Sequence, residues 1–359
     1  MSNFSTKLFV VLALVAGAMV PLSGQKPATA PAQPPVAQDE VLAWPAPPAP
    51  ARIKWVAEYR NAFDVGAKKK RSFIDRLAGK SEEVIWLQRP LTVAVDDKGV
   101  IFVGDFTLGI IAMDPANQKI WAFSSISGAA LPTPTGLAVD SKLVYAASAN
   151  TSQVVVFDKE GRQLSALGKA DGISRPVGLA VDEARDLLIV VNGDEHAVRL
   201  YNRNLKLLKT IGGRGSEEGQ FNFPSYTCIV PGVGFAVADT GNFRIQIFDF
   251  NGRFLRTFGK VGDMPGQFAR PKGLAVDPDG HLYVVDGTFQ NFQIFNQDGR
   301  ILTFVGTGGV RRGQFQTPNG IAIGPDGGIY VADQINRRIQ KFQYLREEKE
   351  APSSNPTPQ

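Results

Sequence analysis

The sequence predicts an all-β protein, namely a six-bladed β-propeller of four-stranded antiparallel blades that is closed by an N-terminal strand. The stretch GQFARPKGLAVDPDGHLYVVD at 266–286 recurs almost unchanged as GQFQTPNGIAIGPDGGIYVAD from Gly313. A proline followed by an apolar strand begins six units, at Pro90, Pro134, Pro176, Pro224, Pro271 and Pro318. The spacing of 42 to 48 residues is that of propeller blades.

Each unit contains the same four short apolar segments. The first resembles GLAVD and is followed by a turn of the DxxG or PDG kind, as in Asp277–Gly280. The second ends in a polar residue, and the third, such as RIQIFD at 244–249, carries a recurring aromatic residue. A turn such as NGR at 251–253 precedes the fourth segment. Four short strands cannot cover both faces of their own sheet, whereas sheets stacked around an axis cover one another.

The predicted propeller domain, 51–346, begins before the first repeated unit, and we explain this additional segment by closure of the ring. The sixth unit has no fourth segment of the usual form, but RIKWVAEYR at 52–60 is a strand-like segment without a partner. We expect it to become the outer strand of blade six. Between it and Pro90, the apolar spacing within 67–86 predicts a short helical insert.

The two ends of the chain have different compositions. Residues 1–24 contain Lys7 and then an apolar run of about 13 residues, which predicts a secretory signal peptide, with an uncleaved membrane anchor as the alternative. The segment 25–50 is rich in Pro and Ala and is expected to be an extended spacer. The charged and Pro-rich segment 347–359 is expected to be a disordered tail. These features predict a periplasmic or secreted protein, and a monomer.

The overall charge is only mildly basic. The 359-residue chain has a net charge of +5 and a pI near 9.2, which falls short of a dense nucleic-acid-binding surface. The single cysteine, Cys228, excludes an internal disulfide. It occupies a position that is Ala in the other units, so we interpret it as a packed thiol rather than a nucleophile.

Taken together, the motifs GQFxxPxGLAVDPDGxLYVVD and NxRIQIFDxxGRFLRTFG (242–259) resemble the repeat of the NHL-repeat family of six-bladed β-propellers. The resemblance covers about residues 52–345 and is closest in units four to six. It implies the propeller fold. Family members bind proteins or RNA, form extracellular parts of receptors, or in a few branches are enzymes, such as the lyase that cleaves peptidyl-hydroxyglycine. The resemblance therefore implies a fold more specifically than an activity.

Few residues of the sequence are candidates for catalysis. A lyase of this family would bind a metal through several histidines, but the chain has only His196 and His281, which the strand order places on opposite faces. We interpret both as surface residues. The sequence thus predicts no catalytic residues, no metal ligands and no cofactor.

The polar residues that end the second segments form the first candidate site. They are Asp105, Ser148, Asn192, Asp239, Asp286 and Asp333. Six such side chains around a channel mouth could bind a hard cation through oxygen atoms. The alternative interpretation, which we prefer because the feature recurs in every blade, is that each accepts hydrogen bonds from the following turn.

A basic set of loop residues forms the second candidate site. The loops after second strands and the links from fourth to first strands emerge on one face. They carry Arg175, Arg214, Arg244, Lys260, Arg270, Arg311, Arg312, Arg337 and Arg338. Such a face suits an acidic protein or envelope polymer, although solubility alone would also explain it.

The predicted function is that of an exported, non-catalytic binding scaffold. A metal-dependent hydrolase or lyase at the channel mouth is the first alternative. An RNA-binding propeller, with Tyr226, Phe243 and Phe289 as stacking residues, is the second. The predicted export argues against RNA, and a membrane would be a partner only if the N-terminal segment remained uncleaved.

Overall fold

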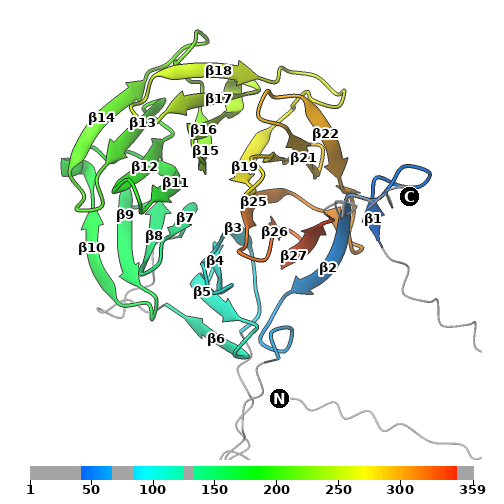
Figure 1. Ribbon diagram of the computed structural model, residues 1–359. Helices are drawn as coiled ribbons and strands as arrows, with labels where there is room; N and C mark the ends of the chain where they lie inside the picture. The colour runs from blue at the N-terminus through cyan, green and yellow to red at the C-terminus, as the bar shows by residue number, and fades with distance from the viewer. Residues whose placement is uncertain (1–41, 67–84, 124–132, 346–359) are drawn as a thin grey trace, which may run out of the picture. The chain divides into compact units, whose positions relative to one another are not determined.

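The repeated units form antiparallel sheets that stand in a ring (Figure 1). This computed structural model describes residues 42–66, 85–123 and 133–345. Each innermost strand lies beside the innermost strand of the next sheet, and the last, β25 (Pro318–Ile323), lies beside the first, β3 (Pro90–Val95). The predicted all-β, six-bladed propeller is confirmed.

The first five blades each contain four strands in simple up-and-down order. From the inside outward, blade 1 consists of β3, β4 (Ile101–Asp105), β5 (Gly109–Asp114) and β6 (Lys119–Ala122). Blade 2 consists of β7 (Gly136–Val139), β8 (Leu143–Ser148), β9 (Gln153–Asp158) and β10 (Gln163–Leu167). Blade 3 consists of β11 (Pro176–Asp182), β12 (Leu187–Asn192), β13 (Ala197–Tyr201) and β14 (Leu207–Gly212). Blade 4 consists of β15 (Pro224–Val230), β16 (Gly234–Asp239), β17 (Arg244–Asp249) and β18 (Phe254–Phe258). Blade 5 consists of β19 (Pro271–Val276), β20 (Leu282–Asp286), β21 (Asn291–Phe295) and β22 (Ile301–Val305).

Blade 6 joins the two ends of the described domain. Its strands β25, β26 (Gly328–Asp333) and β27 (Arg338–Tyr344) are followed outward by β2 (Ile53–Tyr59). The antiparallel register places Ile53 opposite Tyr344 and Tyr59 opposite Ile339. The predicted closing strand is therefore confirmed, and it adds hydrogen bonds between segments almost 300 residues apart.

A fifth strand, β1 (Ala43–Trp44), extends blade 6 beyond the prediction. It lies within 25–50, the segment expected to be an extended spacer. The Trp44 ring packs edge-on against Phe342, with ring centroids 5.7 Å apart. The end of that segment is therefore part of the sheet, because its tryptophan has an apolar surface to cover.

Other predicted segments lie wholly or mostly outside the described residues. These are the signal peptide at 1–24, the tail at 347–359 and nearly all of the helical insert at 67–86, of which only the last two residues are described. There Trp86 forms an isolated bridge with Asn61. The described ranges contain two short 3-10 helices, η1 (Lys169–Asp171) and η2 (Thr240–Asn242). None of the helices within these ranges is long and apolar enough to cross a membrane.

The hydrophobic core lies between neighbouring blades. The second strands are buried along their whole length, as in β16 and β26, because each is covered on both faces. The recurring aromatic residue of the third strand fills the space between sheets. These aromatic residues are Phe157, Tyr201, Phe248, Phe295 and Phe342, and all are buried.

The repeated GQF motif fixes the conformation of the links between blades. In the link from blade 4 to blade 5, the Gln267 side-chain oxygen accepts a hydrogen bond from the Met264 N–H, and the Phe268 ring is buried. Gln220 and Gln314 accept the corresponding bonds in the neighbouring links. A short parallel pairing, β23 (Thr307–Gly308) with β24 (Gln314–Phe315), completes the link into blade 6. The repeat therefore holds three links in the same conformation.

Candidate functional site

The antiparallel order of the strands assigns the loops to two faces. The loops between second and third strands emerge on the same face as the links between blades, and we call this the loop face. The turns between first and second strands, and between third and fourth strands, emerge on the opposite face. Residues of the loop face therefore come from every blade.

The six polar residues that end the second strands are buried beneath the loop face. Asp286 is representative: one carboxylate oxygen accepts the N–H groups of Ala269 and Arg270 at 2.8 and 3.0 Å. The other oxygen accepts the N–H groups of Thr288 and Phe289 at 2.9 and 3.0 Å. Asp105 makes the same pattern of four bonds in blade 1. These carboxylates tie the second strands of blades 1 and 5 to the loops around them.

In blade 3, Asn192 instead donates to the Gly172 carbonyl oxygen and to Glu195, and its own side-chain oxygen has no partner in the described ranges. The prediction that each ring residue accepts hydrogen bonds from the following turn was therefore wrong for Asn192.

Blades 4 and 6 add side-chain donors to this arrangement. Asp333 accepts hydrogen bonds from the side chains of Asn336, Arg338 and Gln340 and from the Gln316 N–H. Burial raises the pKa of Asp333, although these donors act in the opposite direction. Asp239 has the equivalent partners in blade 4. None of the six ring residues lines either of the central cavities described below.

The nine basic residues of the loop face fall into two groups. The exposed group comprises Arg175, Arg214, Lys260, Arg270, Arg311, Arg312 and Arg337. The other two, Arg244 and Arg338, are directed inward and pair with Asp239 and Asp333, each at 2.8 Å. Arg338 has a side chain only 1% exposed and also pairs with Glu58 on β2. The prediction that Arg244 and Arg338 belong to an exposed binding surface was therefore wrong, because both are used inside the blades.

The second residue after each repeated proline determines how much space is left at the centre of the ring. In four blades this residue is glycine: Gly136, Gly178, Gly273 and Gly320. A Cβ atom on any of them would collide with the backbone of the next inner strand. In blades 1 and 4, on opposite sides of the ring, the residue is Thr92 or Tyr226.

Tyr226 crosses the axis of the ring. Its hydroxyl group donates a hydrogen bond to the carbonyl oxygen of Leu91 on the opposite blade, at 3.2 Å. Burial raises the pKa of this phenol well above its ordinary value. The interpretation of Tyr226 as an exposed stacking residue was wrong, because the ring fills the centre of the propeller. Two cavities share Tyr226 as a wall.

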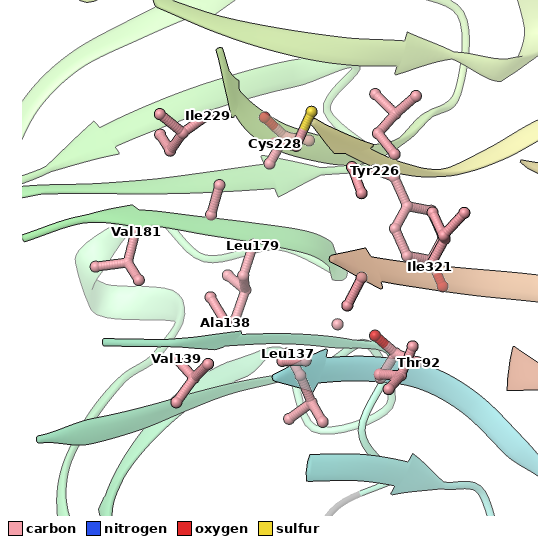
Figure 2. A pocket seen from close by; sticks show the side chains of 18 of the residues that line it. Thr92, Leu137, Ala138, Val139, Leu179, Val181, Tyr226, Cys228, Ile229 and Ile321 are labelled. Carbon is pink, nitrogen blue, oxygen red and sulfur yellow. The ribbon is translucent and has the colours of Figure 1, made fainter. Parts of the chain in front are cut away.

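The cavity on the far side of Tyr226 from the loop face has about 250 Å³, and most of the side chains that line it are apolar. Figure 2 shows Thr92 and Tyr226 toward one end of it and Val139, Val181 and Ile229 toward the other. Cys228 also lines this cavity, and burial raises its pKa to about 12. The group therefore stays a thiol at neutral pH and is a poor nucleophile.

The cavity on the loop-face side, which we call the mouth pocket, has about 290 Å³. Its wall contains the first residue after each repeated proline, one from every blade: Leu91, Thr135, Val177, Ser225, Lys272 and Asn319. Arg175, Asp194, Phe223 and Tyr226 are among the remaining lining residues. The repeated positions build the scaffold, whereas this position differs in all six units.

Lys272 is the most unusual group of the mouth pocket. Its ammonium group forms no ion pair or hydrogen bond with any residue in the described ranges. Burial lowers its pKa to about 8, and the nearby charges of Arg270 and Arg175 act in the same direction. The nearest rim carboxylate, Asp194, is paired with Arg175 at 3.0 Å. The pocket therefore holds a positive charge without a counter-ion.

The other polar groups of the pocket differ in their partners. Thr135 donates to the carbonyl oxygen of Pro176 at 2.8 Å, and the Ser225 hydroxyl is bonded to Thr240 at 2.6 Å. The side-chain oxygen of Asn319 is buried and has no hydrogen-bond partner. Lys272 and Asn319 are therefore the two polar side chains that remain available to a ligand.

The two histidines lie in loops on opposite faces. His196 follows β12 on the loop face and is buried, so the interpretation of this residue as a surface residue was wrong. Its Nδ1 atom accepts the Phe223 N–H at 3.0 Å, and its ring packs on the Phe223 ring. His281 precedes β20 on the opposite face and contacts Asp277 at 2.9 Å.

Asp277, Asp279 and His281 form one group of potential metal ligands on that opposite face. Both oxygens of Asp277 already have partners, since one accepts the His281 N–H and the other accepts the Tyr283 hydroxyl. These bonds hold the turn between β19 and β20, as the equivalent aspartates do in other blades.

The mouth pocket was not predicted from the sequence. The predicted sites lie at recurring polar positions and in basic loops, whereas the pocket is built from the position after each proline, where all six units differ. A comparison of the six units at that position would have found Lys272, the only charged residue among them.

Comparisons with known proteins agree with the repeats and the architecture. The family model described as "NHL repeat" matches residues 268–295 and 315–342. A comparison with curated protein sequences finds no significant match.

Several solved structures share the fold at low sequence identity. A Bacteroides thetaiotaomicron VPI-5482 protein of unknown function is 18% identical, with a TM-score of 0.57 over 72% of this chain and 70% of that one. Kuenenia stuttgartiensis hydrazine synthase is 11% identical, with a TM-score of 0.53 over 78% and 100%. A catalytically inactive histidine-to-alanine variant of virginiamycin B lyase from Staphylococcus aureus, with quinupristin, is 15% identical, with a TM-score of 0.54 over 72% and 96%. At these identities the likeness concerns the fold. The chain is a six-bladed β-propeller that contains NHL repeats.

Proposed function

We propose that this propeller is an exported, non-catalytic scaffold that binds an acidic protein on its loop face. The observation that supports it best is a set of exposed basic side chains without partners in the described ranges: Arg214, Lys260, Arg270, Arg311 and Arg337. Such charges accelerate and orient the encounter with a negatively charged surface. The acidic side chains Asp194 and Glu195 of the same face are neutralised by Arg175 and Arg199.

Apolar side chains accompany these charges on the loop face. They are Phe106, Phe223, Val261, Met264, Val310 and Ile335, all of them exposed. They come from the loops of blades 1 and 6 and from the links into blades 4, 5 and 6. Protein interfaces are enriched in arginine, aromatic residues and methionine, and an envelope polysaccharide would gain less from aliphatic side chains. The composition therefore favours a protein partner over an acidic polymer.

The residues support the lyase alternative less well than they support the scaffold. In the Staphylococcus aureus lyase, replacement of one histidine by alanine gives the inactive variant. Here the two histidines lie on opposite faces, and both Nδ1 atoms are engaged. His196 accepts the Phe223 N–H from the link into blade 4, and His281 contacts Asp277 within its own turn. The oxygens of Asp105 and Asp286 are engaged with backbone N–H groups. At the mouth pocket, the one carboxylate among the lining residues, Asp194, is paired with Arg175.

The RNA alternative loses one of its stacking residues. Tyr226 lies across the centre of the ring and is not free to stack on a base. Phe243 and Phe289 are both half-buried, so only part of each aromatic ring is exposed. The acidic side chains Glu217, Glu218 and Asp263 are exposed among the basic ones, so the loop face lacks the continuous basic surface on which RNA-backbone binding depends. We therefore retain the acidic protein as the partner, and with it the export that residues 1–24 predict.

The proposal is tested by photo-crosslinking in the cell that makes the protein. A crosslinking amino acid replaces Ile335, an exposed loop-face residue, in the full chain. One variant reverses four loop-face charges: Arg214, Arg270, Arg311 and Arg337 to Glu. The matched control reverses four exposed charges in turns of the opposite face: Lys98, Lys142, Lys206 and Arg300 to Glu.

We expect a discrete adduct with an acidic protein that disappears in the loop-face variant and persists in the control. The absence of a discrete adduct, its survival in the loop-face variant, or its equal loss in both variants would contradict the proposal.

A further inference from the structure

The mouth pocket has the form of a small-molecule site. Its volume of about 290 Å³ lies near the lower end of the range for ligand pockets. Tyr226 closes its inner end through the hydrogen bond to Leu91, so the pocket is a cup that opens toward the loop face rather than a passage. One residue of every blade contributes to the wall, which gives the cup a rigid frame.

The charge in this cup lacks a partner. An ammonium group that is partly removed from water and unpaired is costly to keep, and proteins normally pair or neutralise such groups. Lys272 has no carboxylate partner in the described ranges, because Asp194 is occupied by Arg175 and both arginines nearby are cations. An anion bound beside Lys272 would remove this cost.

A second unpartnered group defines the chemistry more closely. The buried side-chain oxygen of Asn319 accepts no hydrogen bond, and Asn319 follows Pro318 at the same position at which Lys272 follows Pro271. A carboxylate can only accept hydrogen bonds, so the contact would be donated by the side-chain NH2 group of Asn319, for which the described ranges likewise contain no partner. Leu91, Val177 and Phe223 supply apolar wall for the body of that ligand.

From this combination, we propose that the mouth pocket binds a small organic carboxylate, whose anionic group pairs with Lys272 and hydrogen-bonds Asn319 while its apolar body lies against Leu91, Val177 and Phe223. The proposal does not depend on the partner protein. A carboxylate fits better than a phosphate, because one ammonium group balances the single negative charge of a carboxylate, whereas a phosphate group carries more than one at pH 7. The pocket offers one lysine as a point charge, and the Arg175 guanidinium is already paired with Asp194.

The pairing has a defined pH range. Lys272 is faced by Arg175 and Arg270, by Asp194, which is paired with Arg175, and by Tyr226, whose hydroxyl is bonded to Leu91. With the pKa of Lys272 at about 8, the ammonium form predominates at pH 7 and is lost above pH 8. Carboxylate affinity should therefore be highest at or below pH 7 and fall as the pH rises past 8.

Isothermal titration calorimetry of the full-length protein tests the proposal. The probes are butyrate and benzoate as carboxylates, butyramide as the neutral counterpart of butyrate, and inorganic phosphate. The variants are Lys272→Met and Asn319→Leu, and Lys142→Met serves as the control because it removes a lysine charge from the opposite face. Thermal unfolding of each variant verifies that it is folded.

We expect saturable binding of a carboxylate to the unmodified protein and to Lys142→Met. Lys272→Met should bind it at least about tenfold more weakly, the ratio that corresponds to about 1.4 kcal/mol. Asn319→Leu should also be weaker, and the affinity should fall between pH 7 and pH 9. The proposal is overturned if neither carboxylate binds, if butyramide or phosphate binds as tightly, or if Lys272→Met leaves the affinity unchanged.

Discussion

The hydroxyl group of Tyr226 on blade 4 lies 3.2 Å from the carbonyl oxygen of Leu91 on blade 1, so a single side chain bridges the two opposite sides of the ring. The glycines at the equivalent positions of four other blades leave the space that this side chain fills. The bridge separates the cavity that contains Cys228 from the mouth pocket, which holds Lys272. The same substitution of tyrosine for glycine thus stiffens the centre and creates the floor of the pocket.

Replacing Tyr226 with phenylalanine should destabilise the fold by about 1 kcal/mol, because it removes the donor to the partly buried carbonyl oxygen of Leu91. Urea unfolding followed by fluorescence measures the change. Tyr344→Phe is the control, since the half-buried Tyr344 makes a ring contact with His281 and no hydroxyl hydrogen bond in the described ranges. Equal stabilities for the two variants would show that the bridge contributes nothing.

Two neighbouring arginines should respond very differently to replacement. Arg338→Leu should destabilise the protein by about 3–5 kcal/mol, because it leaves the buried carboxylate of Asp333 without its ion pair and removes a contact with Glu58 on the closing strand. Arg337→Leu should change the stability by less than about 0.5 kcal/mol, because Arg337 is exposed. Equal effects of the two replacements in chemical unfolding would contradict the assignment.

The inner glycines should not tolerate a side chain. A Cβ atom at Gly273 would overlap the carbonyl oxygen of Asn319 on the next blade, so Gly273→Ala should cost about 2 kcal/mol or more. Gly168→Ala is the matched control, since Gly168 has an extended backbone and open space around its Cα. Thermal unfolding of both variants provides the comparison, and similar melting temperatures would show that the inner strands can separate.

Lys272→Met should stabilise the protein at neutral pH, by about 1–2 kcal/mol after allowance for solvent at the pocket. The folded-state pKa of about 8 lies below the ordinary value of 10.5, so the unfolded chain binds the proton more tightly. The lysine therefore lowers stability below pH 8, and this cost disappears as the pH rises from 8 to 10.5. Urea unfolding at pH 7 and pH 10 should show the advantage of the variant shrinking. An advantage that stays constant with pH would exclude the lowered pKa as its cause.

The fold could be predicted from the sequence because the residues that determine the shape of a blade recur along the chain. The aspartate turns, the third-strand aromatics and the GQF links recur at fixed spacing, and the missing outer strand of blade 6 matched an isolated segment at 52–60. The short strand β1 was missed because two residues among prolines carry no periodic signal.

The site could be predicted only in part, since it depends on contacts between distant segments. Arg337 and Arg338 are adjacent, and nothing local distinguishes them. The burial of Arg338 follows from Asp333 and from Glu58, which is 280 residues away. The isolation of Lys272 follows likewise from the pairing of Asp194 with Arg175 on blade 3. Tyr226 did carry a signal, because it replaces a glycine of the repeat, but its direction across the axis required the closed ring.

The central claim about the pocket is that Lys272 is accessible, unpaired and occupied by carboxylates. Its most direct test is competitive amine labelling of the full-length protein at pH 8, with the modified lysines quantified by mass spectrometry. A lysine with a pKa of about 8 is about half unprotonated at pH 8, whereas an ordinary lysine with a pKa of about 10.4 is almost fully protonated. Lys272 should therefore react faster than exposed lysines such as Lys98 and Lys142. We predict that Lys272 is labelled fastest and that butyrate or benzoate protects it alone. Labelling of Lys272 no faster than that of Lys98, with no protection by either carboxylate, would contradict the account.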